Sequence, residues 1–175
     1  SKRRVIDWAL GVGRTVMARR AAGKALAPGL ALQRRVADAL VFKKFQDKLG
    51  GRLRFFVSGG APLSKEIGEF FYSVGVTILE GYGLTETSPV IAVNRLPTPR
   101  FGSVGQLILE VEVWIADDGE ILTRGPHVMQ GYYQKPQVTA DVMIDGWVHT
   151  GDIGHLDDEG FLYITDRKKD LIKTA

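Results

Sequence analysis

The chain has 175 residues, a formal net charge of +3, 45% hydrophobic residues and no cysteine. This composition is ordinary for a globular protein, and the length suits one compact domain or part of a larger one. The lack of cysteine excludes disulfides and Cys-ligated zinc, and it is compatible with a reducing cytosol. No apolar run approaches the ~20 residues that a membrane-spanning helix needs.

The positive charge is concentrated in the N-terminal part of the chain. Residues 1–49 hold twelve Lys/Arg against three Asp/Glu, whereas residues 50–175 hold eleven against seventeen. A basic helical stretch is most often a solvated helix face, although it can attract anionic lipid or nucleic acid. No aromatic interleaving or nucleic-acid motif accompanies it. We therefore expect no nucleic-acid partner, and a peripheral contact with the inner face of the membrane stays open.

Two helices and a strand–helix–strand unit are predicted in the first 80 residues. Apolar residues recur at helical spacing over residues 2–22 and 30–48. Short apolar runs at residues 53–57 and 76–79 then indicate buried strands on either side of a helix at residues 65–74. Two strands joined through a helix should be parallel, with a right-handed crossover.

Ser64 and Gly75 are expected to bound the helix of this unit. Ser64 precedes it and can accept a hydrogen bond from its first turn, and Gly75 follows it and suits the left-handed conformation that ends many helices. From about Phe101 the pattern becomes that of short strands with turns such as Asp118-Gly119, interrupted by a short helix at residues 136–143. This half predicts a small barrel or curled sheet.

Glycine-rich segments follow both strands of the strand–helix–strand unit, namely Ser58-Gly59-Gly60-Ala61 and Glu80-Gly81-Tyr82-Gly83-Leu84-Thr85-Glu86. In parallel sheets, ligands bind beyond the carboxyl ends of strands, and glycine lets backbone N–H groups approach a flat or anionic ligand. Tyr82 offers a face to a purine, Thr85 a hydroxyl to phosphate, and Glu86 an oxygen ligand to Mg²⁺. The alternative is a structural turn in which Tyr82 packs against the sheet.

Other polar segments also have two interpretations. Thr150-Gly151-Asp152 is either a turn or a site where Asp152 accepts hydrogen bonds from two ribose hydroxyls. The charged run Asp166–Asp170 is either solvated or a pivot after a strand. The three histidines show no metal-ligand spacing, so we interpret them as structural or surface residues.

Several motifs together resemble one enzyme superfamily. The first three are Gly81-Tyr82-Gly83-Leu84-Thr85-Glu86-Thr87, Thr150-Gly151-Asp152 and Asp166-Arg167-Lys168-Lys169-Asp170. In order and interval they resemble the adenylate-forming superfamily of acyl-CoA synthetases, firefly luciferases and peptide-synthetase adenylation domains. Further motifs narrow the resemblance to bacterial long-chain fatty acid–CoA ligases over about residues 45–175: Ser58-Gly59-Gly60-Ala61-Pro62-Leu63, Gly131-Tyr132-Tyr133 and Gly146-Trp147-Val148-His149.

The resemblance implies an α/β fold: part of an acyl-CoA synthetase-like N-terminal domain, with a parallel sheet and flanking helices followed by a small β-barrel-like subdomain. It implies ATP, Mg²⁺, coenzyme A and a fatty acid as cofactor and substrates. A carboxylate attacks the α-phosphate of ATP to give acyl-adenylate and pyrophosphate, and the thiolate of CoA then displaces AMP. The residues implied to bind the nucleotide are Gly59, Gly60, Ala61, Glu80, Gly81, Tyr82, Gly83, Thr85, Asp152 and Arg167.

Individual roles follow from the same resemblance. Tyr82 stacks on adenine, with Glu80 placed to accept a hydrogen bond from the adenine amino group. Thr85 and Glu86 are the catalytic residues, because Thr85 contacts phosphate and Glu86 holds Mg²⁺. Lys169 occupies the hinge position at which a C-terminal domain rotates between the two steps. Asp152 and Arg167 bind the ribose hydroxyls.

The sequence also departs from the resemblance. No Ser/Thr/Gly-rich loop ending in Lys precedes residue 50, and nothing follows Ala175. We therefore expect a piece of a longer ligase that is inactive alone, with an α/β part at residues 1–100, a barrel-like part at 101–165 and the start of a hinge at 166–175. The alternatives are a ligase for an aryl, acetyl or amino acid, or a non-catalytic nucleotide-binding module. We expect a cytoplasmic location, and the oligomeric state is left open.

Overall fold

The computed structural model describes residues 1–97 and 99–170, so residues 171–175 of the expected hinge lie outside the described residues. The chain divides into two compact units. The helical unit comprises residues 1–58 and 63–79, and the sheet unit comprises residues 59–62 and the chain from residue 80 onward. The expected division near residue 100 stays a prediction. In the described part of the chain, no helix has the length and apolar character needed to span a membrane.

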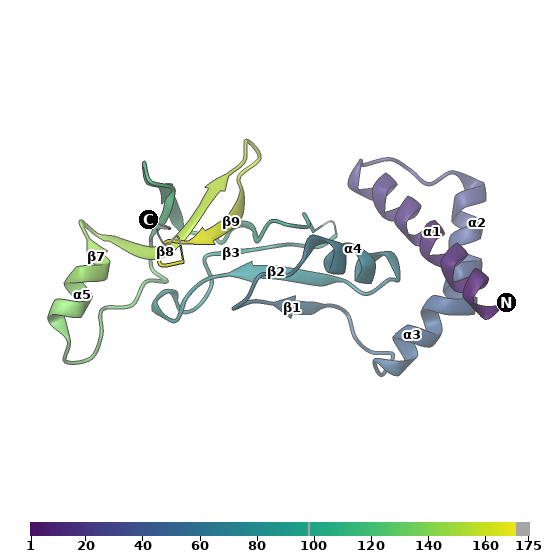
Figure 1. Cartoon of the computed structure of the whole chain (residues 1–175), viewed down its shortest axis with the longest axis horizontal. Coiled ribbons are helices and arrows are strands. Elements are labelled where there is room, and N and C mark those ends of the chain that lie inside the picture. Colours follow the sequence, from purple (N-terminus) through teal and green to yellow (C-terminus); the bar gives the residue numbers. More distant parts are fainter. Residues whose placement is uncertain (98, 171–175) are drawn as a thin grey trace. The chain divides into compact units, whose positions relative to one another are not determined.

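The helical unit follows the predicted order of elements (Figure 1). These are α1 (Lys2–Ala21), α2 (Pro28–Ala37), a π-helical turn (Asp38–Phe42), α3 (Lys43–Lys48), β1 (Phe56–Ser58) and α4 (Lys65–Ser73). The apolar stripe of α1 contributes Ala9, Val12 and Val16 to a core that also contains Phe42. The predicted helix at 30–48 is therefore one continuous helical stretch with a π-helical turn in its middle.

The predicted boundaries of α4 are confirmed. Ser64 accepts a hydrogen bond from the N–H of Ile67 at 3.4 Å, and Gly75 follows the helix with a φ of +86°. The strand before α4 is shorter and begins later than the sequence predicted. β1 nevertheless runs parallel to β2 (Ile78–Tyr82), because Phe56 donates to Thr77 and a Cβ on Gly59 would lie 3.3 Å from the carbonyl oxygen of Gly81.

The sheet unit is built from antiparallel strands (Figure 1). Its further elements are β3 (Ala92–Val93), β4 (Gly105–Leu107), β5 (Glu112–Ile115), β6 (Glu120–Arg124), α5 (Pro136–Val142), β7 (Met143–Ile144), β8 (Trp147–Leu156) and β9 (Phe161–Arg167). The strand order is β2-β3-β4-β9-β8-β6-β5, and β7 pairs with β8. Gly119, with a φ of +85°, allows the predicted tight turn between β5 and β6.

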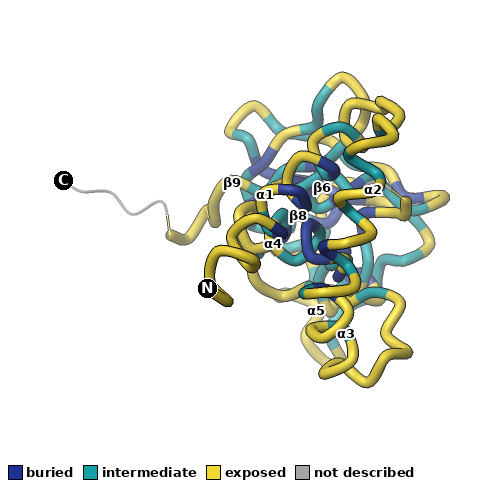
Figure 2. The backbone as a smooth tube through the Cα atoms, turned by 90° about the vertical axis from the view of Figure 1, so that its right-hand side faces the viewer, coloured by how far each residue is buried: buried dark blue, intermediate teal, exposed yellow. Residues whose placement is uncertain are grey.

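The sheet unit has a hydrophobic core of its own. It contains the buried side chains of Ile91, Ala92, Val111, Ile121 and Leu162. In Figure 2 the buried segments are dark blue and the exposed loop tips are yellow. The polar residues of the candidate site lie at the ends of β2 and β9 and in the middle of β8.

Candidate functional site

The end of β2 carries the first part of the glycine-rich motif. The strand runs three residues past the predicted boundary at residue 79 and ends at Tyr82, so Gly81 lies within it rather than in a loop. Immediately after the strand, a Cβ on Gly83 would collide with the carbonyl oxygen of Pro89. Only glycine fits there without a shift of the backbone, which explains the second glycine of the motif.

The loop after Gly83 is held by one buried hydroxyl. Thr87 Oγ1 accepts a hydrogen bond from the N–H of Leu84 at 2.9 Å and lies 3.0 Å from the carbonyl oxygens of both Leu84 and Pro89. The loop therefore closes on itself and leaves Thr85 exposed. Such a fixed loop can present a hydroxyl to a ligand without first being ordered by it.

Three predicted site residues from three strands meet in the sheet unit. The hydroxyl of Tyr82 donates to Asp152 Oδ2 at 2.7 Å, and Arg167 Nε donates to Asp152 Oδ1 at 3.1 Å. Asp152 and Arg167 face one another in the β8–β9 ladder, and Asp152 is only 6% exposed. β2 and β8 are not neighbours in the sheet, so the Tyr82–Asp152 bond requires the sheet to curl.

Asp152 retains the capacity to accept more hydrogen bonds. An ionised carboxylate has about four lone-pair sites, and Tyr82 and Arg167 occupy one on each oxygen. Each oxygen can therefore accept one further hydroxyl. The geometry is compatible with the pair of ribose hydrogen bonds expected of this residue.

Burial and nearby groups shift the pKa values of two side chains at the end of β2. Burial raises the pKa of Tyr82, and the Asp152 carboxylate that accepts its hydrogen bond raises it further, against a smaller lowering by Thr150, so Tyr82 remains a neutral donor. Burial also raises the pKa of Glu80, opposed by a hydrogen bond with the backbone of Gly102. The ring of Tyr82 packs against the core of the sheet unit, which is the structural alternative considered for this residue.

Glu86 is held by a residue from a distant loop. The hydroxyl of Tyr132 donates to Glu86 Oε1 at 2.6 Å, and this bond raises the pKa of Tyr132. The backbone carbonyl of Glu86 accepts the N–H of Met129 at 2.8 Å. Within residues 1–97 and 99–170, no group of three or more His, Cys, Asp or Glu side chains could hold a metal ion. A cation at Glu86 would therefore need ligands from a bound molecule and water.

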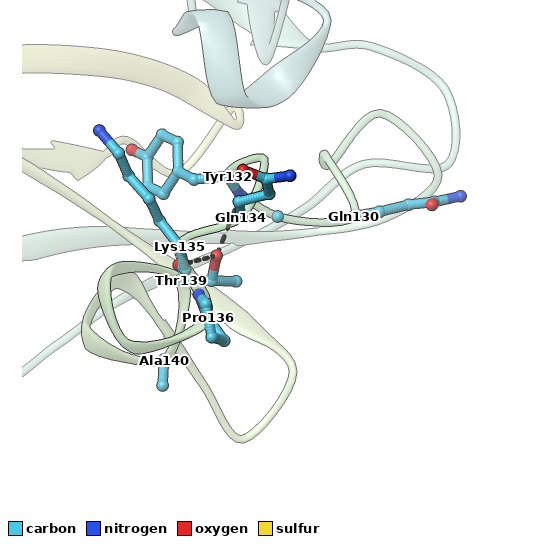
Figure 3. Close-up of a pocket in the computed structure, with 8 residues that line it drawn as sticks. Gln130, Tyr132, Gln134, Lys135, Pro136, Thr139 and Ala140 are labelled. Carbon is cyan, nitrogen blue, oxygen red and sulfur yellow. Dashed lines mark hydrogen bonds between the residues drawn. The ribbon is translucent and has the colours of Figure 1, made fainter.

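A surface hollow of about 480 Å³ lies beside Tyr132 (Figure 3). Thr139 fixes one wall, because its Oγ1 accepts the N–H of Tyr132 at 2.9 Å and lies 3.0 Å from the carbonyl oxygen of Lys135. The hollow is wide and open to solvent, and Lys135 is the one charged residue that lines it. It is too open to enclose a ligand by itself.

The remaining predicted site residues lie at the surface of the sheet unit. Gly59, Gly60 and Ala61 are exposed, and Gly60 has a φ of +81°. Lys169 is exposed in the turn that follows β9. In the described part of the chain, neither the glycine-rich segment at residues 59–61 nor Lys169 is hydrogen-bonded to the Tyr82–Asp152 cluster. Their roles therefore stay predictions.

One buried carboxylate beside this cluster was not predicted from the sequence. Glu120 is 4% exposed and accepts hydrogen bonds from His149 Nδ1 at 3.1 Å, the N–H of Gly151 at 3.0 Å and Lys168 Nζ at 2.8 Å. Burial raises the pKa of Glu120, but these three donors outweigh it and hold the pKa below its ordinary value. The sequence shows Glu120 only as the residue after a turn, so no signal marked it.

Comparisons with known proteins agree with the motifs. A family described as AMP-binding enzyme matches residues 20–133. Long-chain-fatty-acid--CoA ligase FadD15 of Mycobacterium bovis is 47% identical over 150 residues, which is 85% of this chain and 25% of that protein. Long chain acyl-CoA synthetase 1 of Arabidopsis thaliana is 44% identical over 156 residues, which is 80% of this chain and 24% of that protein.

A solved structure shows a similar fold. O-succinylbenzoate coenzyme A synthetase (MenE) from Bacillus subtilis, in complex with ATP and magnesium ion, aligns with a TM-score of 0.61 and 30% identity over 75% of this chain and 32% of that chain. The chain spans about a quarter of the length of the curated relatives it matches.

Proposed function

Because the chain belongs to the AMP-binding enzyme family, we propose that it contributes the nucleotide site of a long-chain fatty acid–CoA ligase. In the first step a fatty-acid carboxylate attacks the α-phosphorus of ATP and pyrophosphate leaves. In the second step the CoA thiolate attacks the acyl carbon and AMP leaves. The observation that carries the proposal is the meeting of Tyr82, Asp152 and Arg167 from three strands within hydrogen-bond distance.

The cluster suits the sugar of an adenine nucleotide. Asp152 has one free acceptor position on each oxygen for the two ribose hydroxyls, and Arg167 and Tyr82 fix its orientation. We assign the adenine to the region of Tyr82 and Glu80, where the raised pKa of Glu80 is compatible with hydrogen bonding to a neutral base. Gly59 and its neighbours would border the same base.

The phosphates are assigned to Thr85 and Glu86. The exposed hydroxyl of Thr85 is available to a phosphate oxygen, and Glu86 keeps Oε2 available while Tyr132 binds Oε1. Mg²⁺ is commonly held by one or two carboxylates together with substrate phosphates and water, so a single Glu86 fits that role. When bound, the ion would neutralise charge on the phosphates, while Tyr132 keeps Glu86 oriented.

Calorimetry can test the nucleotide site in the 175-residue chain. Titration with AMP and with a non-hydrolysable palmitoyl-adenylate should show binding of both, with the adenylate bound more tightly. A non-catalytic module that does not recognise nucleotides would bind neither. Matched adenylates of benzoate and acetate test the acyl class, and tighter binding of either one would contradict the fatty-acid assignment.

Catalysis is a separate question, since the relatives are about four times as long as the chain. We expect no steady pyrophosphate release from the 175-residue chain with ATP and palmitate, and sustained turnover would contradict that expectation. The hinge role of Lys169, the cytoplasmic location and the peripheral membrane contact stay predictions.

A further inference from the structure

Glu120 lies at the start of β6, which pairs with β8, the strand that carries Asp152, and β8 pairs in turn with β9, which carries Arg167. Its side chain is almost completely buried, yet it is charged. Burying a carboxylate is unfavourable unless charged or polar donors satisfy it. The position of those donors therefore indicates what the buried charge holds in place.

The two oxygens of Glu120 contact residues adjacent to the site. Oε1 accepts the backbone N–H of Gly151 at 3.0 Å, and Gly151 directly precedes Asp152. Oε2 accepts Lys168 Nζ at 2.8 Å, and Lys168 directly follows Arg167. One carboxylate thus contacts both strands one step along the ladder from the Asp152–Arg167 pair, where Lys168 also donates its backbone N–H to Gly151 at 2.8 Å.

The backbone ladder is irregular where these contacts occur. The register shifts between Ile153 and Gly154 in the β8–β9 pairing, and between Glu120 and Leu122 in the β6–β8 pairing. Such irregularities redirect side chains and locally weaken a ladder. Glu120 adds two side-chain contacts near these irregularities, one to β8 and one to the residue that follows β9.

Resting on the proposed function, we propose that Glu120 is a positioning residue for ribose recognition. It holds β8 and β9 so that Asp152 and Arg167 face the two ribose hydroxyls in one geometry. His149 Nδ1, at 3.1 Å from Oε2, and Asp118, at 2.7 Å from Lys168 Nζ, complete the contacts of this clamp. Glu120 itself does not touch the nucleotide.

The substitution Glu120→Gln tests the clamp with little change in volume. An amide can still accept the N–H of Gly151, but it is neutral and cannot form the ion pair with Lys168. The matched control is Glu112→Gln on β5, which also removes a carboxylate from an ion pair, in this case with Arg124 at 2.6 Å. Glu112 contacts none of the site residues in the described structure.

The readout is calorimetric titration of each protein with AMP and with 2′,3′-dideoxy-AMP, which lacks both ribose hydroxyls. We expect Glu120→Gln to weaken AMP binding about tenfold, the effect of losing well-oriented hydrogen bonds to a charged acceptor. Binding of the dideoxy nucleotide should stay unchanged, and Glu112→Gln should behave as the wild type with both ligands.

If Glu120→Gln weakened the binding of AMP and of the dideoxy nucleotide equally, the proposal would be overturned. A general loosening of the fold would affect both ligands, whether or not they carry ribose hydroxyls. Unchanged AMP binding would overturn it as well. A wild-type chain that binds no AMP would count against the proposed function instead. Amide hydrogen exchange then still tests the clamp, since Glu120→Gln should speed exchange of the N–H of Lys168, which donates to Gly151 at 2.8 Å. Unaltered exchange would reject it.

Discussion

The helical unit and the sheet unit differ in what they bury. In the helical unit the fully buried side chains are apolar, such as Val16 and Phe42, and the only buried polar residue described there is Ser73. The sheet unit buries several polar residues, namely Glu80, Thr87, Asn94, Ser103, Glu120, Thr123 and Asp152. Burial of apolar side chains stabilises a fold without requiring particular contact directions, whereas each buried polar group needs a hydrogen-bond partner in a particular position. Two of these buried polar residues, Glu80 and Asp152, belong to the candidate site.

The largest expected effect comes from Asp152→Ala. Losing two hydrogen bonds to a charged acceptor should weaken AMP binding by about 2–4 kcal/mol, measured by calorimetry. Asp152→Asn, which keeps one acceptor oxygen, should fall between the alanine variant and the wild type. An unchanged affinity of Asp152→Ala for AMP would argue against the ribose role.

The next effect concerns packing in the helical unit. A Cβ on Gly13 of α1 would collide with the carbonyl oxygen of Ser73, whereas a Cβ on Gly11 would have no atom within 4 Å. Gly13→Ala should therefore lower the free energy of unfolding by about 1–3 kcal/mol. Gly11→Ala should raise it by up to about 1 kcal/mol, because alanine is the better helix former. Urea unfolding measures both, and similar values for the two variants would contradict the close approach of α1 and α4.

A smaller effect is expected from the buried charge of Glu80. Its pKa is raised by burial above the ordinary value of 4.5, so the folded state favours the protonated form. The ionised form therefore destabilises the fold as pH rises through that range. Glu80→Gln should stabilise the chain at pH 7 by about 1 kcal/mol and give no gain near pH 4. Thermal unfolding at both pH values would show this, and an equal gain at each would refute the electrostatic cause.

The smallest effect should come from Glu112→Gln. The Glu112–Arg124 ion pair is about half exposed on both sides, and exposed pairs contribute roughly 0–1 kcal/mol. The change in unfolding free energy should stay below about 0.5 kcal/mol and shrink further in high salt. A large, salt-independent loss would mean that surface charge matters in the sheet unit as much as buried charge does.

The sequence predicted the elements whose signals are local. Ser64, Gly75 and the Asp118-Gly119 turn act on their immediate neighbours, and the structure places them as predicted. The strand ends were less predictable. β2 extends to Tyr82 and β9 to Arg167, because pairing with β3 and β8 continues past the apolar residues that mark the strands in the sequence.

The sequence proposed residues for the candidate site but did not predict how they are arranged. The motifs named Tyr82, Asp152 and Arg167, but nothing in their spacing shows that Tyr82 bonds to Asp152 or that Tyr132 holds Glu86. Glu120 was missed because its role depends on the register of three strands. Such a register depends on long-range pairing, which the local pattern of a single sequence does not contain.

The Tyr82–Asp152 bond joins residues that are 70 positions apart in the chain. Closing a loop of this length costs conformational entropy, and a fold rich in such non-local contacts folds more slowly. The glycine-rich motif precedes β8 and β9 in the chain and is synthesised before them. Tyr82 can bond to Asp152 only after β8 has been made and has paired in the sheet. A nascent or proteolysed chain that ends before residue 150 would contain the complete glycine-rich motif but would lack Asp152 and Arg167, and with them the candidate site.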